Sequence, residues 1–280
     1  MTLSGTNSYL IDCGNGEAVC IDPGPADTAH VSAIVERAER MACRIRTIAM
    51  THGHPDHAPA APILQSRTGA SISTGRHPIH AGITLLEVAA APGHAADHVV
   101  YYEPREAALF TGDTVLGAGY VVVAPPGGDM RAYQQTLEML RDRFANARTI
   151  YPGHGEPIRD PAGKLADYIE HRKIRERQIL DVLAHHSSTI PDVVETIYRD
   201  TPEVLWPVAA RQVLAYLIAL QREGKVQAQP LHRVPTKRES ALLNPNWDEI
   251  AGNSDRDVVR TELGAGLHVD NIMRYSLLSS

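Results

Sequence analysis

The sequence has little cysteine, few large aromatic side chains and no long apolar run. It contains 3 cysteines, 2 phenylalanines and 2 tryptophans in 280 residues. Three thiols cannot build a disulfide framework, which favours a reducing compartment inside the cell. A membrane-spanning helix needs about 18 or more consecutive apolar residues, and no such run occurs. The first residues also lack the basic and then apolar pattern of a signal peptide. We therefore predict a cytoplasmic protein with no membrane partner.

An excess of positive charge is absent as well. The net charge is −6, so the chain as a whole is not a general binder of polyanions. Histidine is abundant instead, with 14 residues. An imidazole-rich and thiol-poor composition points to metal or acid–base chemistry, and composition alone does not choose between them.

The first 157 residues or so alternate short apolar runs with Gly, Pro and Asp. The runs predict buried strands, and two segments with apolar residues three and four positions apart predict helices. The expected strands are 9–12, 18–22, 45–50, 85–89, 99–102, 107–110 and 149–151, and the expected helices are 29–41 and 132–144. Strand–helix–strand order with strand pairs predicts an α/β fold around a mixed sheet.

The character of the chain changes after this region. A long charged helix, two shorter helices and a hairpin-like segment predict a small winged-helix module; they occupy 165–184, 191–198, 208–222 and 225–234. We predict a catalytic domain over 1–184, a winged-helix domain over 185–236 and an extension of unknown structure over 237–280. A helical patch at 255–263 is the only readable element of that extension.

The strongest signal directly follows the strand expected at 45–50. Three imidazoles and a carboxylate, His52, His54, Asp56 and His57, occur within six residues. A loop at a strand end can direct alternate side chains to two neighbouring points, so two of these residues can serve one metal and two another. A solvated turn that is rich in histidine is the alternative, and this density of ligands speaks against it. Imidazole and carboxylate ligands suit Zn²⁺, with Fe or Mn as further candidates.

Three further candidate ligands lie downstream, and each follows an expected strand. His94, Asp113 and His154 each have a glycine beside them, which permits close approach of the backbone. A single Gly-His pair is usually a surface loop. Taken together and in this order, the three residues complete two coordination shells.

This ordered pattern resembles that of the metallo-β-lactamase-fold hydrolases. The resemblance implies an αββα sandwich with the site along one edge of the sheets, and two Zn²⁺ ions. By this likeness, one ion is held by His52, His54 and His94, the second by Asp56, His57 and His154, and Asp113 bridges them. Asp22 matches an aspartate that supports the histidine loop from behind, as metal-bound imidazoles generally require.

The implied chemistry is hydrolysis. Two metal ions about 3.5–4 Å apart lower the pKa of a shared water, and the resulting bridging hydroxide attacks a carbonyl carbon or a phosphorus. Asp56 is then both a ligand and the catalytic group that orients the hydroxide or moves its proton. His98 has two possible roles. It either supports a ligand or contacts the substrate, or it makes a purely structural hydrogen bond. The other histidines and the three cysteines are expected to be surface residues and buried thiols, respectively.

Further phrases narrow the resemblance to one family. Residues 5–10, the charged helix at 168–180, Leu205-Trp206 and a short wing at 223–226 occur together as in the β-lactamase-like protein 2 family, over roughly residues 5–235. That family implies divalent-metal cleavage of single-stranded RNA. Its cousins include thioesterases that release polyketides, so hydrolysis of a small-molecule thioester, ester or lactone is the alternative, with weak β-lactamase activity besides.

The charges of the chain favour the alternative. Residues 185–236 carry five Lys or Arg and five Asp or Glu, whereas a nucleic-acid enzyme should present a basic surface. The one basic concentration is Arg172, Lys173, Arg175 and Arg177 on the long helix. This group is read either as a solvated face or as a rim for an anionic substrate. A non-catalytic regulator that binds nucleic acid is a remote third reading, because all seven ligand positions are intact.

Two features of the sequence bear on the sheet edge and on assembly. Only four residues precede the Gly5-Thr6-Asn7 phrase, where family members usually have a strand or two, so we expect either a reduced sheet edge or a truncated start. The unassigned tail and the early strand are compatible with a homodimer.

Overall fold

The computed structural model describes residues 5–73, 75–247 and 272–278. The chain divides into two compact units, and both are discontinuous in sequence: one comprises 2–121 and 136–166, and the other comprises 122–135 and 167–280. We refer to them as the catalytic unit and the C-terminal unit. The predicted first domain includes 122–135 and 167–184, whereas in the structure these segments belong to the C-terminal unit.

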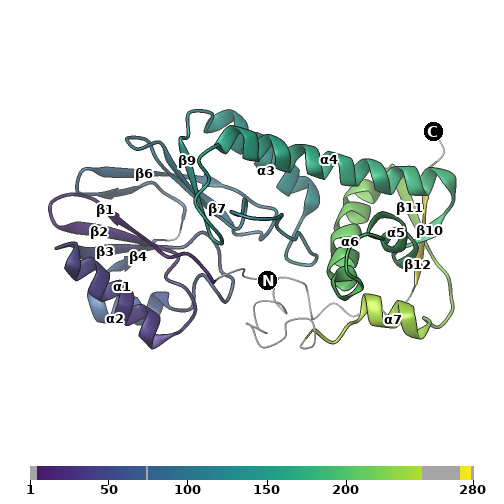
Figure 1. The fold of residues 1–280 in the computed structure, drawn as a ribbon, viewed down its shortest axis with the longest axis horizontal. Coiled ribbons are helices and arrows are strands. Elements are labelled where there is room, and N and C mark those ends of the chain that lie inside the picture. Colours follow the sequence, from purple (N-terminus) through teal and green to yellow (C-terminus); the bar gives the residue numbers. More distant parts are fainter. Residues whose placement is uncertain (1–4, 74, 248–271, 279–280) are drawn as a thin grey trace. The chain divides into compact units, whose positions relative to one another are not determined.

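Two sheets form the centre of the catalytic unit (Figure 1). The first has the order β1-β2-β3-β4, with β1 (Tyr9–Asp12), β2 (Glu17–Ile21), β3 (Arg44–Ala49) and β4 (Ser71–Ile72). The second has the order β5-β6-β7-β8-β9, with β5 (Ile79–Ala81), β6 (Thr84–Ala90), β7 (Val99–Glu103), β8 (Ala108–Gly112) and β9 (Thr149–Pro152). The pairs β2/β3, β3/β4 and β8/β9 are parallel and the others antiparallel, which gives the mixed sheets that the sequence predicted.

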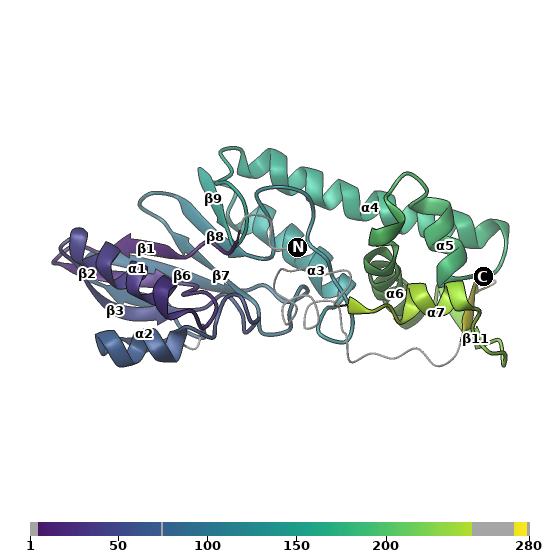
Figure 2. The same ribbon diagram turned by 60° about the horizontal axis from the view of Figure 1, so that its bottom comes forward.

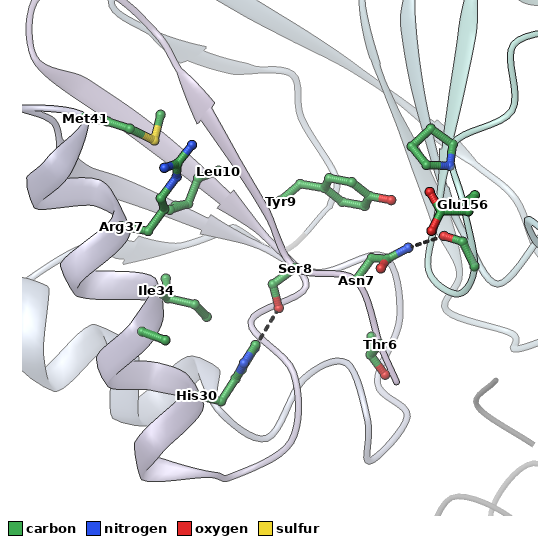
Figure 3. Close-up of a pocket in the computed structure, with 13 residues that line it drawn as sticks. Thr6, Asn7, Ser8, Tyr9, Leu10, His30, Ile34, Arg37, Met41 and Glu156 are labelled. Atoms are coloured by element: carbon green, nitrogen blue, oxygen red, sulfur yellow. Dashed lines mark hydrogen bonds between the residues drawn. The ribbon is translucent and has the colours of Figure 1, made fainter. Parts of the chain in front are cut away.

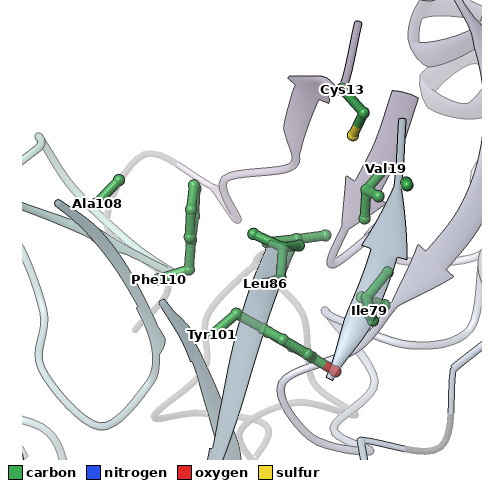
Figure 4. Packing of buried hydrophobic residues seen from close by; sticks show 10 residues of the cluster. Cys13, Val19, Ile79, Leu86, Tyr101, Ala108 and Phe110 are labelled. Carbon is green, nitrogen blue, oxygen red and sulfur yellow. The ribbon is translucent and has the colours of Figure 1, made fainter. Parts of the chain in front are cut away.

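Apolar side chains of both sheets meet in one core (Figure 4). Val19 and Ile21 from the first sheet pack in one cluster with Leu86, Tyr101 and Phe110 from the second. Full burial of such a side chain stabilises the fold by about 1.5–3 kcal/mol relative to exposure. This shared core fixes the two sheets against each other, and the strand ends therefore present their loops at a defined edge.

Helices cover the outer faces. On the first sheet, α1 (Thr28–Arg40) and α2 (Ala61–Thr68) bury Val31, Ile34 and Leu64 together with Ile45 and Ile48 of β3. On the second sheet, α3 (Met130–Arg143) buries Leu137 and Leu140, and the ring of Phe144, the next residue after the helix, lies 5.0 Å from that of Tyr102 on β7. The αββα sandwich is thus confirmed. Helix α2 was not predicted, because its eight residues have only a weak apolar stripe.

The C-terminal unit has the element order of a winged helix (Figure 2). It contains most of α4 (Pro161–His185), then β10 (Ser188–Thr189), α5 (Ile190–Ile197), α6 (Trp206–Arg222), β11 (Val226–Pro230), α7 (Lys237–Leu243) and β12 (Met273–Leu277). The three strands form a sheet in the order β10-β12-β11.

The predicted hairpin at 225–234 is wrong. Residues 226–230 form a single strand, β11, and its partner is β12 at the far end of the tail, with Val226 opposite Leu277 and Ala228 opposite Tyr275. The tail therefore supplies the middle strand of the wing sheet. The helical patch expected at 255–263 lies outside the described residues.

Helix α6 is the core of the C-terminal unit. Eleven of its residues are buried, from Val208 to Leu220, including Arg211 and Gln212. Among the described residues, only Glu203–Arg222 is a helical stretch long and apolar enough to cross a membrane, and 61% of its apolar window is buried inside the protein. Burial on this scale explains the apolar composition, since a helix that is hydrophobic all round is a buried helix.

Candidate metal centre

Asp22 organises the histidine loop from the neighbouring strand. Strands β2 and β3 are parallel, so Asp22 after β2 lies beside Thr51 after β3. Its carboxylate accepts hydrogen bonds from the Thr51 amide at 2.7 Å and the Thr51 hydroxyl at 2.8 Å, and it lies 2.9 Å from Nδ1 of His57. Hydrogen bonds to a charged group contribute about 1.5–3 kcal/mol each. The structure thus places Asp22 behind the loop, where the sequence analysis expected it.

The seven predicted ligand positions gather into two groups. One comprises His52, His54 and His94, the other Asp56, His57, Asp113 and His154, and within each group one ligand atom per residue lies within 4.8 Å of all the others. Six of the seven side chains are buried, and His54 is half-buried. Strand ends therefore bring together residues that are up to 102 positions apart in the sequence.

Asp113 lies between the two groups. Its Oδ1 is 3.3 Å from Nε2 of His57, and its Oδ2 is 3.3 Å from Nε2 of His154 and 3.9 Å from Nε2 of His94. Asp56 completes the second group, with Oδ2 3.0 Å from Nε2 of His154. A carboxylate that faces both groups is in the right place to bridge two ions.

The donor atoms fit a pair of divalent cations. The buried atoms Nε2 of His52, Oδ1 of Asp56 and Oδ1 of Asp113 make no hydrogen bond. A buried polar atom without a hydrogen-bond partner costs about 1–3 kcal/mol. Three such atoms in one cluster therefore indicate a missing partner, such as a metal ion. Imidazole nitrogens and carboxylate oxygens are the ligands that zinc takes, and iron or manganese accept them too. The site is therefore a His/Asp cluster that can hold two metal ions.

The two groups differ in their protonation. Burial lowers the pKa of His52 well below its usual value, and burial lowers that of His54 to about 4. Burial alone would also lower the pKa of His57 and His154, but the neighbouring carboxylates outweigh it, and Asp113 has the largest effect among them. The pKa of His57 is therefore raised, and that of His154 is raised to about 10. In Asp56, the pKa is held below its usual value by hydrogen bonds with His154 and His57, which outweigh burial.

His98 lies directly behind the ligands. Its Nε2 accepts a hydrogen bond from the backbone amide of Asp113 at 3.1 Å, and its Nδ1 lies 3.4 Å from the hydroxyl of Thr114. The ring stacks on that of His52, with centroids 4.6 Å apart. Because Nε2 acts as an acceptor, the proton of the neutral ring lies on Nδ1. Through these contacts, His98 supports the candidate ligands Asp113 and His52, and they do not require a contact with the substrate.

Residues near the start of the chain also support the centre, and sequence reasoning gave them no role. The hydroxyl of Thr6 donates to Oδ2 of Asp56 at 3.1 Å, and the carbonyl of Gly5 lies 3.0 Å from Nδ1 of His154. The Asn7 side chain donates to the carbonyls of Pro152 and Gly155. The Gly-Thr-Asn phrase was the available signal, but its spacing alone does not show which loop it touches.

The four basic residues predicted to lie together on the long helix differ in their exposure. Arg172 is only 2% exposed, and its guanidinium carbon lies 5.1 Å from the centroid of the Tyr133 ring. It is therefore neither part of a solvated face nor part of a rim for an anionic substrate. Arg177, which is exposed, pairs with Glu170, and Arg175 stacks over Tyr198. Of the four, only Lys173 and Arg177 are exposed.

Family comparisons agree with this architecture. The model of the metallo-beta-lactamase superfamily matches residues 1–77 and 74–154, and that of the beta-lactamase associated winged helix domain matches 189–231. The chain belongs to the metallo-beta-lactamase superfamily, whose members are generally metal-dependent hydrolases, and it is a hydrolase of that class.

Curated relatives give a narrower family. The Beta-lactamase-like protein 2 homolog of Drosophila melanogaster is 33% identical over 81% of this chain and 86% of its own length. The protein of the same name from Caenorhabditis elegans is 33% identical over 81% and 82%. Lactamase-like protein adaB of Aspergillus niger is 31% identical over 72% and 71%. The likeness to β-lactamase-like protein 2 that the motifs indicated is thus confirmed.

Solved structures show the same fold. A beta-lactamase domain protein from Burkholderia ambifaria matches with a TM-score of 0.69 and 16% identity, over 98% of this chain and 87% of its own. A metallo-beta-lactamase family protein from Thermus thermophilus matches with a TM-score of 0.64 and 22% identity, over 80% and 91%. At these identities, the likeness concerns the fold alone.

Proposed function

We propose that the protein is a two-zinc hydrolase whose substrate is an ester, thioester or lactone. The observation that carries the proposal is the pair of ligand groups joined by Asp113. His52, His54 and His94 would hold one ion and Asp56, His57 and His154 the other, with Asp113 shared between them. When bound, the ions supply Lewis acidity, which polarises the scissile bond and lowers the pKa of water toward neutrality.

The residues of the chain supply orientation. Asp22 fixes the Nδ1 side of His57 so that its Nε2 faces the cluster. Asp56 keeps Oδ1 buried and without a hydrogen bond, and its pKa lies below the usual value, so the group is an ionised acceptor. As an ionised acceptor it would orient an attacking water molecule through a hydrogen bond, while its lowered pKa makes it a weak base.

The charge distribution favours an acyl substrate over RNA. A winged helix that reads nucleic acid needs an exposed reading helix and a basic surface. In the C-terminal unit, α6 is a core helix, and buried Arg172 leaves the charged face of α4 less basic than its sequence indicated. Both observations also argue against a non-catalytic nucleic-acid-binding regulator.

Cleavage of single-stranded RNA is the second candidate. It is supported by the 33% identity to β-lactamase-like protein 2 homologues together with the resemblance of the motifs to that family. The same two-ion chemistry serves a phosphodiester as well as a carbonyl, so the site itself does not separate the two.

One screen tests both candidates. The purified protein is assayed for metal content and then for hydrolysis of an acyl thioester, a lactone, single-stranded RNA and a cephalosporin. We expect about two zinc ions per chain, and turnover of the thioester or lactone above that of RNA. Asp113→Asn should abolish turnover while the circular dichroism spectrum stays unchanged. Full activity in metal-free protein would contradict the proposal, and turnover of RNA alone would replace the acyl substrate by the second candidate.

Two further proposals concern the compartment and the oligomeric state. We propose a cytoplasmic protein, since the described thiols are free and buried and the apolar helix is internal. A homodimer is tested by size-exclusion chromatography with light scattering.

A further inference from the structure

The last ligand, His154, lies in a turn that has little stiffness of its own. It is flanked by Gly153 and Gly155, and Gly155 has a φ of +82°. Glycine loses more conformational freedom on folding than any other residue, so a Gly-His-Gly turn is held in place only by external contacts. Its position must nevertheless be accurate, because Nε2 of His154 is 3.0 Å from Asp56 and 3.3 Å from Asp113.

Backbone hydrogen bonds with Gly112 and Gly117 supply some of these contacts, and Asn7 supplies others on both sides of the histidine. Its side-chain amide donates to the carbonyl of Pro152 at 3.0 Å and to that of Gly155 at 2.7 Å. Its backbone amide donates to the carbonyl of Gly153 at 2.7 Å. In Figure 3, the dashed line from Asn7 reaches the turn that carries Glu156. An amide group has two N–H donors and both partners are carbonyls, so both bonds form at once.

The first ligand group has separate supports. His52 contacts Thr51, which Asp22 holds in turn, and the loop before His94 is fixed by a hydrogen bond from Thr136 to the carbonyl of Pro92. The three hydrogen bonds that Asn7 donates to the 152–155 turn involve none of these residues. Loss of the Asn7 side chain should therefore act on His154 and the second group, and leave the first group alone.

We propose that Asn7 is a positioning residue of the metal centre, which clamps the 152–155 turn and thereby holds His154 on the second ion. The inference rests on the proposed two-ion function. Residues that orient a metal ligand typically contribute 10- to 100-fold to metal affinity. The first ion, bound by His52, His54 and His94, should keep its affinity.

Ser8 offers a matched control in the same segment, directly before β1. Its side chain points away from the turn, and its hydroxyl lies 2.9 Å from Nε2 of His30 on α1 (Figure 3). Ser8→Ala thus removes one hydrogen bond next to Asn7 without touching the 152–155 turn. Tyr9→Phe should weaken the second ion less than Asn7→Ala does, because it removes only one hydrogen bond to the turn, from the Tyr9 hydroxyl to the carbonyl of Pro152.

The test is a titration of metal-free full-length protein with Zn²⁺ alone, followed by calorimetry, with Co²⁺ absorbance in parallel. His54→Ala and His154→Ala identify the signals of the first and the second ion. For Asn7→Ala and Asn7→Asp, we expect the second ion to bind about 10- to 100-fold more weakly, with the first unchanged. Asn7→Asp guards against a packing effect, because the carboxylate keeps the shape of the side chain and loses its donors.

Three results would overturn the proposal. Wild-type affinity for both ions in Asn7→Ala would show that the clamp has no effect on the metal. Equal weakening of the binding of both ions, or the same weakening in Ser8→Ala, would show a general loosening of the segment before β1. Failure of the wild-type protein to bind a pair of ions would instead overturn the proposed function, so the two failures are distinguishable.

Discussion

At the scale of single residues, the metal centre tolerates almost no added volume beside its last ligand. A Cβ atom on Gly153 would lie 2.3 Å from Oδ1 of Asp113 and 2.7 Å from Cε1 of His57. Overpacking of this kind typically costs about 1–3 kcal/mol, and here the atoms that must move are ligands. Gly153→Ala should therefore displace Asp113 and lower turnover by at least about 10-fold, which corresponds to about 1.4 kcal/mol.

Gly127 provides the control for this substitution. A Cβ atom there meets nothing within 4 Å, so Gly127→Ala should leave turnover and metal content unchanged. Steady-state kinetics and metal analysis of both variants check the prediction. Gly153→Ala with normal turnover would show that Asp113 can move without harm, which is incompatible with a bridging role.

The gathering of the candidate ligands into two groups could be predicted from the sequence. His52, His54, Asp56 and His57 lie in one short loop, so their proximity follows from the sequence alone. The remaining ligands could be placed because each follows a strand and strand ends meet at a sheet edge. The burial of Arg172 could not be predicted, because a charged helix gives no sign that three tyrosines surround one of its cations.

At the scale of secondary-structure elements, the long strands and amphipathic helices were predicted within a few residues, and the long-range pairing was not. Strand β11 has the alternation of a hairpin arm, but its partner β12 lies more than 40 residues further along the chain. Pairing between distant segments leaves no local pattern in the sequence. Helix α6 was predicted correctly, whereas its role as a core helix depends on contacts such as that of Gln212 with the amide of Val123.

The middle position of β12 makes a prediction about stability. Tyr275 is 4% exposed, and its strand pairs with β10 on one side and β11 on the other. Removal of a large buried aromatic side chain typically costs about 3–5 kcal/mol, which for a unit of this size lowers the melting temperature by about 10 °C or more. Thermal unfolding followed by circular dichroism measures the shift for Tyr275→Ala. Leu278→Ala, at a side chain that is 44% exposed, is the control and should melt close to the wild type.

At the scale of the whole molecule, the division into two units separates metal binding from the C-terminal module. Every candidate ligand, and every residue proposed to support one, including Asp22, His98 and Asn7, belongs to the catalytic unit. The cores of the two units also differ: one lies between two sheets, and the other surrounds α6. Each unit therefore has its own source of stability.

Metal removal should consequently destabilise one unit only. A ligand present at 100 times its Kd stabilises the folded state by about 2.7 kcal/mol, and this contribution is lost when a chelator removes it. For about 150 residues, we expect the melting temperature of the catalytic unit to fall by about 5–10 °C, with that of the C-terminal unit unchanged. Tyr275→Ala should do the opposite and lower only the C-terminal transition. Differential scanning calorimetry of both samples, with and without chelator, resolves the two effects. A shift of both transitions on metal removal would mean that the two units unfold as one.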